Sequence, residues 1–193
     1  MSNEAFERAV ERELGVVGPY SSEDLAGLSG LILSDGHGTL PRIMECTQIK
    51  TISFSRWDTA TIGPMPPTLI SVSFKDSPLA SIQDLCSLTA LKYVDLIQTL
   101  VTDLSPLLDL PALRSVDVRA CPLTPTSLQV LDDLQARGVR LSRTNRPDPR
   151  ALAIMDRLRE RGILLCVLID DYEGGLRIFH PGTELDQMAA LTL

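Results

Sequence analysis

The chain has 193 residues, of which 44 % are hydrophobic and 22 % charged, and its formal net charge is −7. This composition excludes disordered and collagen-like chains and is sufficient for one domain with a sizeable core. The acidic balance argues against nucleic-acid binding, because neutralising phosphates needs a basic face. The basic residues concentrate between Arg137 and Arg161, a stretch that holds eight arginines.

The sequence carries no pattern of an exported or membrane protein. The segment MSNEAFERAVERELG is charged from Glu4 onward and lacks the continuous apolar core of a secretory signal. No later stretch has the apolar length of a membrane span. The four cysteines are widely spaced without a CxxC pair, which indicates free, buried thiols. We therefore expect a cytoplasmic protein with no membrane partner. The cysteines are Cys46, Cys86, Cys121 and Cys166.

Five segments share one apolar pattern, in which a first apolar residue is followed by others three and five positions later. The middle residues of successive segments lie 21, 20, 22 and 22 residues apart. The alternation and β-branched content predict a short strand in each segment, followed by a polar turn and a second apolar group. The segments are Leu28-Leu31-Leu33, Ile49-Ile52-Phe54, Leu69-Val72-Phe74, Leu91-Val94-Leu96 and Leu113-Val116-Val118.

This regular period predicts a repeat architecture. One unit cannot bury its apolar side alone, whereas stacked units bury their apolar sides together. The predicted fold is an α/β solenoid with a concave parallel β-sheet and a continuous core behind it. Within it, one turn is Val101-Thr-Asp-Leu-Ser-Pro-Leu107, and two strands are preceded by the similar segments Leu88-Thr-Ala-Leu91 and Leu110-Pro-Ala-Leu113.

Through these segments the chain resembles the internalin-like leucine-rich repeats, a bacterial class whose repeat has about 22 residues. The resemblance covers roughly residues 5 to 142. It implies a leucine-rich-repeat fold and a habit of binding other proteins. It also implies that residues 6–15 form an amphipathic helix and residues 22–28 a lead-in, which together cap the first strand.

The chain departs from this family at the position of its asparagine ladder, five residues after each middle anchor. Ser, Thr and Cys can donate to neighbouring carbonyls there, though more weakly than Asn. Glycine and tryptophan cannot, so we expect the first two turns to be irregular and Trp57 to fill one of them as a wedge. The ladder positions hold Gly36, Trp57, Ser77, Thr99 and Cys121.

The C-terminal part follows a different sequence pattern from the five repeats. Residues 127–141 align with residues 151–165, and both read as an amphipathic helix that ends at glycine and leads into a strand. We expect residues 163–169 to extend the parallel sheet and residues 176–179 to form a terminal hairpin with them. The predicted scheme is a single domain over 1–193, with a helical cap over 1–22, repeats over 23–142, and the last helix-strand repeat and C-terminal cap over 143–193.

Groups suited to catalysis are few. His37 lies in a turn between repeats, and Cys166 with His180 does not by itself establish a nucleophile pair. The acidic turn at 170–173 lacks the ligand spacing of a calcium loop. We find no nucleotide, dinucleotide or zinc motif, and expect no cofactor, no metal and no enzymatic activity.

The residues between and just after the strand anchors are expected to point outward on the concave face. Asp95, Asp117 and Arg140 fall in one column of consecutive repeats, which places the two carboxylates about 5 Å apart and offers Arg140 as a partner for Asp117. A lysine or arginine of a binding partner would then enter between the carboxylates. The candidate partner-binding residues are Arg56, Lys75, Asp76, Tyr93, Asp95, Ile97, Gln98, Asp117, Arg119 and Arg140.

These features favour a non-catalytic protein-binding module, and specifically a bacterial intracellular inhibitor or toxin-immunity protein that binds a basic toxin or enzyme. Two alternatives stay open at this level. One is a secreted host-binding effector, which export of the native protein would favour. The other is a small enzyme that uses Cys166 and His180, which loss of turnover in Cys166→Ala would favour.

Overall fold

The computed structural model describes residues 4–143, 166–169 and 176–179. Its main element is a six-stranded parallel sheet whose strands are ordered as in the chain. All five predicted segments contain a strand, so that part of the sequence prediction is confirmed. The strands are β1 (Gly30–Ser34), β2 (Thr51–Ser55), β3 (Ser71–Ser77), β4 (Tyr93–Thr99), β5 (Ser115–Asp117) and β6 (Arg140–Ser142).

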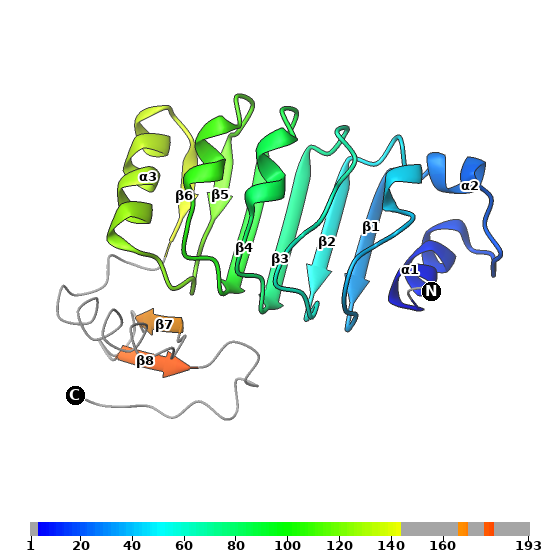
Figure 1. Cartoon of the computed structure of the whole chain (residues 1–193), viewed down its shortest axis with the longest axis horizontal. Coiled ribbons are helices and arrows are strands. Elements are labelled where there is room, and N and C mark those ends of the chain that lie inside the picture. The colour runs from blue at the N-terminus through cyan, green and yellow to red at the C-terminus, as the bar shows by residue number, and fades with distance from the viewer. Residues whose placement is uncertain (1–3, 144–165, 170–175, 180–193) are drawn as a thin grey trace.

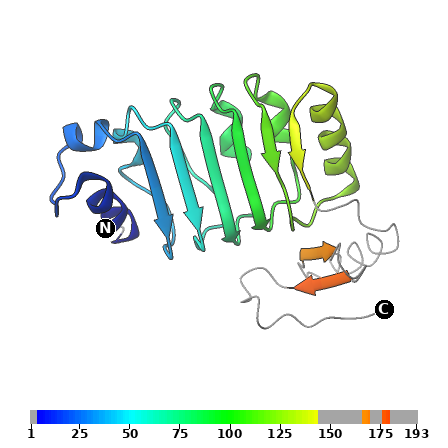
Figure 2. The same cartoon turned by 180° about the vertical axis from the view of Figure 1, so that it is seen from behind.

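Helical segments lie in four of the five connections between the strands and form a second layer (Figure 1), and two further helices precede β1. Seen from the other side, the strands lie in front of this layer (Figure 2). We call the sheet surface turned away from the helical layer the open face. The helical segments are α1 (Glu4–Leu14), α2 (Ser22–Ala26), α3 (Pro125–Ala136) and the 3₁₀ turns η1 (Ile43–Glu45), η2 (Gln83–Ser87) and η3 (Ser105–Asp109).

The core lies between the two layers and is built from the strand anchors. The five middle anchors are in register on adjacent strands and are at most 2 % exposed. Phe54 and Phe74 stack in the same layer with ring centroids 4.4 Å apart. Each apolar row therefore runs continuously through the repeats and removes its side chains from water. The middle anchors are Leu31, Ile52, Val72, Val94 and Val116.

Helix α1 lies at the N-terminal end of the sheet (Figure 1). Its buried side carries Phe6 and Val10, and the Arg12 guanidinium donates a hydrogen bond to the carbonyl of Ile32 in β1. A strand at the edge of a sheet has unpaired backbone groups, and such contacts satisfy them and obstruct further pairing. The helix that the resemblance implies is thus present at its predicted place.

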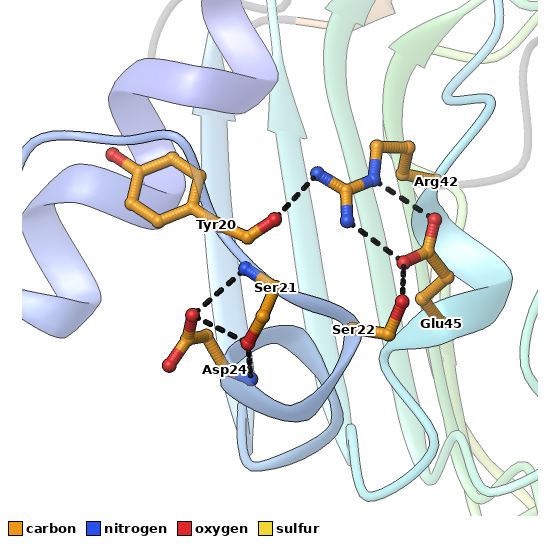
Figure 3. A network of polar contacts seen from close by, with 6 residues as sticks. All are labelled: Tyr20, Ser21, Ser22, Asp24, Arg42 and Glu45. Carbon is orange, nitrogen blue, oxygen red and sulfur yellow. Dashed lines mark hydrogen bonds and ion pairs between the residues drawn. The ribbon is translucent and has the colours of Figure 1, made fainter.

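A polar network joins α2 to η1 (Figure 3). Arg42 donates to both carboxylate oxygens of Glu45 at 2.9 and 2.8 Å and to the carbonyl of Tyr20 at 3.1 Å. The Ser22 hydroxyl also donates to Glu45, at 2.8 Å. These donors, Arg42 first, lower the pKa of Glu45 to about 2. Ser21 begins α2 in a capping box with Asp24.

The turns that follow β1 to β5 share one backbone conformation. The residue four positions after each middle anchor has a positive φ, between 50° and 59°. The first two turns share this φ with the later ones. They differ in that β1 and β2 end before the left-handed residue, whereas β3 and β4 continue one residue beyond it. These residues are Asp35, Arg56, Asp76, Gln98 and Ala120.

Gly36 and Trp57 replace the polar ladder residue in the first two turns, and Trp57 supplies contacts in its place. Trp57 is 1 % exposed, packs edge to face against Phe54 and covers Gly36. Its ring N–H donates to the carbonyl of Gly38 at 2.9 Å, and its backbone N–H donates to the hydroxyl of Ser77 at 3.1 Å. The predicted role of Trp57 as a wedge is confirmed.

The last part of the chain agrees with the prediction only in part. Helix α3 (Pro125–Ala136) and β6 (Arg140–Ser142) form the first predicted helix-strand unit, whereas the second predicted helix, at 151–161, lies outside the described residues. Strand β7 (Cys166–Ile169) pairs antiparallel with β8 (Leu176–Phe179) in a separate two-stranded sheet, so the hairpin is confirmed. The parallel extension is wrong for these four residues, because β7 pairs with β8, which a short connection allows, and not with the six-stranded sheet.

We predict that Gly36→Ala destabilises the fold. The added Cβ would lie 2.1 and 2.6 Å from ring carbons of Trp57 and 2.7 Å from the Cβ of Ala5. Overpacking of this kind costs roughly 1 to 3 kcal/mol, measured as a lower urea midpoint with an unchanged slope. Gly27→Ala is the matched control, because its Cβ would meet nothing closer than 3.7 Å. Equal stability of the two variants would show that Trp57 does not pack on Gly36.

Candidate functional site

The register of the sheet fixes which side chains are neighbours on its open face. Three columns cross the strands there. The first contains Gly30, Thr51, Ser71, Tyr93, Ser115 and Arg140; the second contains Ile32, Ser53, Ser73, Asp95, Asp117 and Ser142; the third contains Ser34, Ser55, Lys75 and Ile97. Small hydroxyl side chains dominate β2 and β3, and larger or charged side chains gather on β4 and β5.

Arg140 is not where the repeat pattern predicts it. It lies opposite Ser115 in the first column, and Ser142 is the residue opposite Asp117. The predicted pairing of Arg140 with Asp117 is therefore wrong. The physical reason is that α3 changes the connection before β6. Val139 is buried directly before the strand, and Leu141 is the residue in register with the middle anchor Val116.

Asp117 is instead held by Arg119, two residues along the chain. Its carboxylate accepts hydrogen bonds from the Arg119 side chain at 2.7 and 3.0 Å and from the Arg119 backbone N–H at 3.1 Å. Asp117 is 9 % exposed, whereas Arg119 is exposed. Two-pronged, charge-assisted pairing of this kind offsets the cost of removing a carboxylate from water.

Asp95 has no such compensation. It lies beside Asp117 in the second column, is half-buried, and within residues 4–143 has neither a hydrogen bond nor an ion pair. Burial raises the pKa of Asp95, and the charge of Asp117 raises it further, whereas Lys75 and Arg119 act in the opposite direction. The open face therefore holds one carboxylate that the fold itself destabilises when it is ionised.

The neighbours of Asp95 supply polar and apolar contact groups. Ser73, its register partner on β3, has a buried hydroxyl oxygen with no hydrogen-bond partner among the described residues. On β4 itself, Tyr93 is 38 % exposed and Ile97 is half-buried. Ile32 lies at the β1 end of the second column, the column of Asp95, and is 54 % exposed. It is an apolar residue that was not among the predicted binding residues. Its place between two buried anchors was the available indication.

The remaining predicted residues separate into two groups. Arg56, Asp76 and Gln98 are the positive-φ residues of their turns and lie at the C-terminal ends of the strands. Arg56 donates to both oxygens of Asp35 at 2.6 and 2.9 Å, so its charge is already matched. Lys75 is exposed and lies opposite Ile97. The structure thus brings together Lys75, Tyr93, Asp95 and Ile97, with Asp117 and Arg119 beside them.

The described part of the chain contains no group of three or more His, Cys, Asp or Glu side chains placed to hold a metal ion. None of its helices is both long and apolar enough to cross a membrane. Burial raises the pKa of the Cys46 and Cys121 thiols to about 11, which makes both poor nucleophiles. His180 and the acidic turn at 170–173 lie outside the described residues, as does the side chain of Cys166.

Known structures resemble this fold. Internalin C2 from Listeria monocytogenes superposes with a TM-score of 0.62 and 20 % sequence identity, over 74 % of this chain and 65 % of that chain. A second Listeria monocytogenes internalin (inlF) matches with a TM-score of 0.38 and 11 % identity, over 74 % of this chain and 56 % of that one. No protein-family model and no curated protein matches the sequence.

The likeness to internalin C2 concerns the fold. Together with the parallel sheet of six strands, it supports a leucine-rich-repeat type of α/β architecture. This chain spans 65 % of the length of internalin C2 and 56 % of the other internalin. The candidate site is therefore argued from the residues of this chain alone.

We predict opposite effects for two isosteric substitutions on the open face. Asp95→Asn should raise stability at pH 7 by a few tenths to roughly 1 kcal/mol, because it removes a like-charge contact. Asp117→Asn should lower stability, because it weakens the bonds with Arg119. The pKa of Asp95 is raised in the folded state, so the ionised carboxylate lowers the stability of the fold. This loss of stability is fully present at pH values above the folded-state pKa. It disappears as the pH falls below the ordinary aspartate value of about 3.9.

Chemical denaturation of both variants from pH 3 to 7 checks this. The advantage of Asp95→Asn should shrink as the pH approaches the lower limit. A loss of stability in Asp95→Asn at pH 7 would mean that Asp95 has a stabilising partner and is not the uncompensated carboxylate.

Proposed function

We propose that this protein is a non-catalytic interaction module whose open face binds another protein. A fold similar to that of an internalin is consistent with protein binding. The residues of the open face support this role independently. The observation that best supports this proposal is the state of Asp95. It is a half-buried carboxylate without a partner among the described residues, and it lies next to the exposed ring of Tyr93. A cationic group of a partner would neutralise Asp95, because Asp117 is already paired with Arg119.

The surroundings of Asp95 suit an interface core. Binding energy usually concentrates in a few residues, often aromatic, that are shielded from water by neighbours of lower individual importance. Tyr93 and Ile97 flank Asp95 on β4, and the small serines of β2 and β3 leave room for a partner to approach closely. We infer that a lysine or arginine of the partner lies over Asp95, with Tyr93 and Ile97 excluding water from the contact.

The finer proposal is an inhibitor of toxin-immunity type acting on a basic toxin or enzyme. A net charge of −7 would accelerate association with a basic partner through long-range attraction. The proposed location is the cytoplasm. The free thiols of Cys46, Cys86 and Cys121 are compatible with such a reducing compartment.

The test starts from affinity capture in the source cell, identification of the captured protein, and its purification. The identified partner should be basic and should lose its activity when mixed with an equimolar amount of this protein. Asp95→Ala and Tyr93→Ala should each weaken binding at least about tenfold, and Asp95→Ala should also flatten the dependence of affinity on salt.

Gln129→Ala, on the exposed side of α3, is the control and should bind as the unmodified protein does. Unchanged affinity in both open-face variants would exclude the open face as the binding site. A partner that keeps its full activity when saturated would exclude the inhibitor role and leave only a binding function.

A further inference from the structure

A row of basic residues follows the edge of the sheet at which the strands begin. Backbone N–H groups of Ile70, Lys92, Arg114 and Arg140 donate to the carbonyls of the preceding positions, Lys50, Ile70, Lys92 and Arg114, at 2.8, 2.8, 2.8 and 2.9 Å. Five neighbouring positions are thus connected strand by strand, and four of them are basic. We call Lys50, Lys92, Arg114 and Arg140 the basic row.

No acidic side chain of the protein neutralises this row within the described residues. The ion pairs found there use Arg8, Arg42, Arg56, Arg119 and Arg143 instead. Lys50, Arg114 and Arg140 are exposed, and Lys92 is half-buried. Adjacent strands lie about 4.8 Å apart, so Lys92 and Arg114, which come directly before β4 and β5, are like charges at equivalent positions, an arrangement that is destabilising. Arg140 is displaced by one residue and lies opposite Ser115.

The row is local and contrasts with the rest of the molecule. The chain has a net charge of −7, yet four basic residues without acidic partners lie along a single edge. Asp95 lies three residues beyond Lys92 along the same strand, and Asp117 three residues beyond Arg114. At about 3.3 Å per residue, Lys92 and Arg114 are separated from the two carboxylates by about 10 Å along the strands.

We propose that the basic row binds an acidic segment of a partner protein, whose Asp or Glu side chains pair with Lys92, Arg114 and Arg140. A nucleic acid is disfavoured, because its closely spaced phosphates would also approach Asp95 and Asp117. A protein segment can place carboxylates on the row and keep other side chains over the acidic part of the face. This inference does not depend on a contact at Asp95.

The end of the row offers space for such a segment. Arg140 lines an open groove of about 710 Å³ together with Ser115, Gln135 and Ser142. Hydroxyl and amide groups beside a guanidinium provide further donors for a carboxylate. We therefore expect the acidic side chains to reach the groove from the direction of Arg114.

The sequence contained a sign of the row. The position two residues before the middle anchor is basic in three of the five repeats, at Lys50, Lys92 and Arg114. The first outward column was placed one residue before each middle anchor, so the position two residues before it was not selected. Arg140 was selected, but for a different column.

The test is a titration of the full-length ¹⁵N-labelled protein with a blocked octaglutamate peptide at low salt. Amide shifts should concentrate at Lys92, Arg114, Ser115 and Arg140. Lys92→Gln with Arg114→Gln should weaken binding about fivefold or more, the loss expected for two exposed ion pairs, and should leave the melting temperature unchanged or higher.

Arg8→Gln, which removes one positive charge on α1, serves as the control for Arg114→Gln alone and should change the affinity less than that row variant does. Shifts located away from the row, or equal affinity of the row variant and the unmodified protein, would overturn the proposal. Tighter binding of an oligothymidylate of equal charge at the same residues would also overturn it, in favour of a nucleic-acid site. Octaglutamate carries no basic group, so this result is independent of the proposed contact at Asp95.

Discussion

The alignment of buried anchors on adjacent parallel strands is the constraint on which the rest of the structure depends. Strands β1 to β4 each place two apolar side chains in the core, and the side chains between them point to the open face. Side chains alternate with a period of two, so a slip of one residue would expose an entire apolar set and bury polar groups. The core therefore determines which polar side chains become neighbours on the opposite surface.

Two electrostatic conflicts follow from this register. Asp95 and Asp117 are adjacent because Val94 and Val116 are adjacent in the core, and the basic row exists because the residues that enter β4, β5 and β6 are also linked strand by strand. Arg119 compensates Asp117 but leaves Asp95 without a hydrogen bond or ion pair among the described residues. Unresolved charges on an ordered surface are a common property of binding sites, where a partner supplies the missing interaction. The charges also lie on rigid strands, which lowers the entropic cost of binding.

The sequence was sufficient to predict the strands and the pairing from β1 to β5, because the spacing of the anchors encodes both. It was not sufficient for Arg140, since the connection before β6 contains a full helix and Val139, not Leu141, resembles a middle anchor. The positive-φ turns were missed because residues such as Arg56 carry no marker of that conformation. The contact of Trp57 with Gly36 and the pairing of Arg119 with Asp117 depend on three-dimensional packing that no repeat pattern specifies.

The central claim is that the fold leaves Asp95 as a desolvated carboxylate beside a second one. Its most direct test is the pKa of Asp95, measured by ¹³C NMR titration of the side-chain carboxyl in the unmodified protein and in Asp117→Asn. The account predicts a pKa above the ordinary aspartate value of about 3.9, which falls when the charge of Asp117 is removed. A pKa at or below that value, or one that does not respond to Asp117→Asn, would contradict the account.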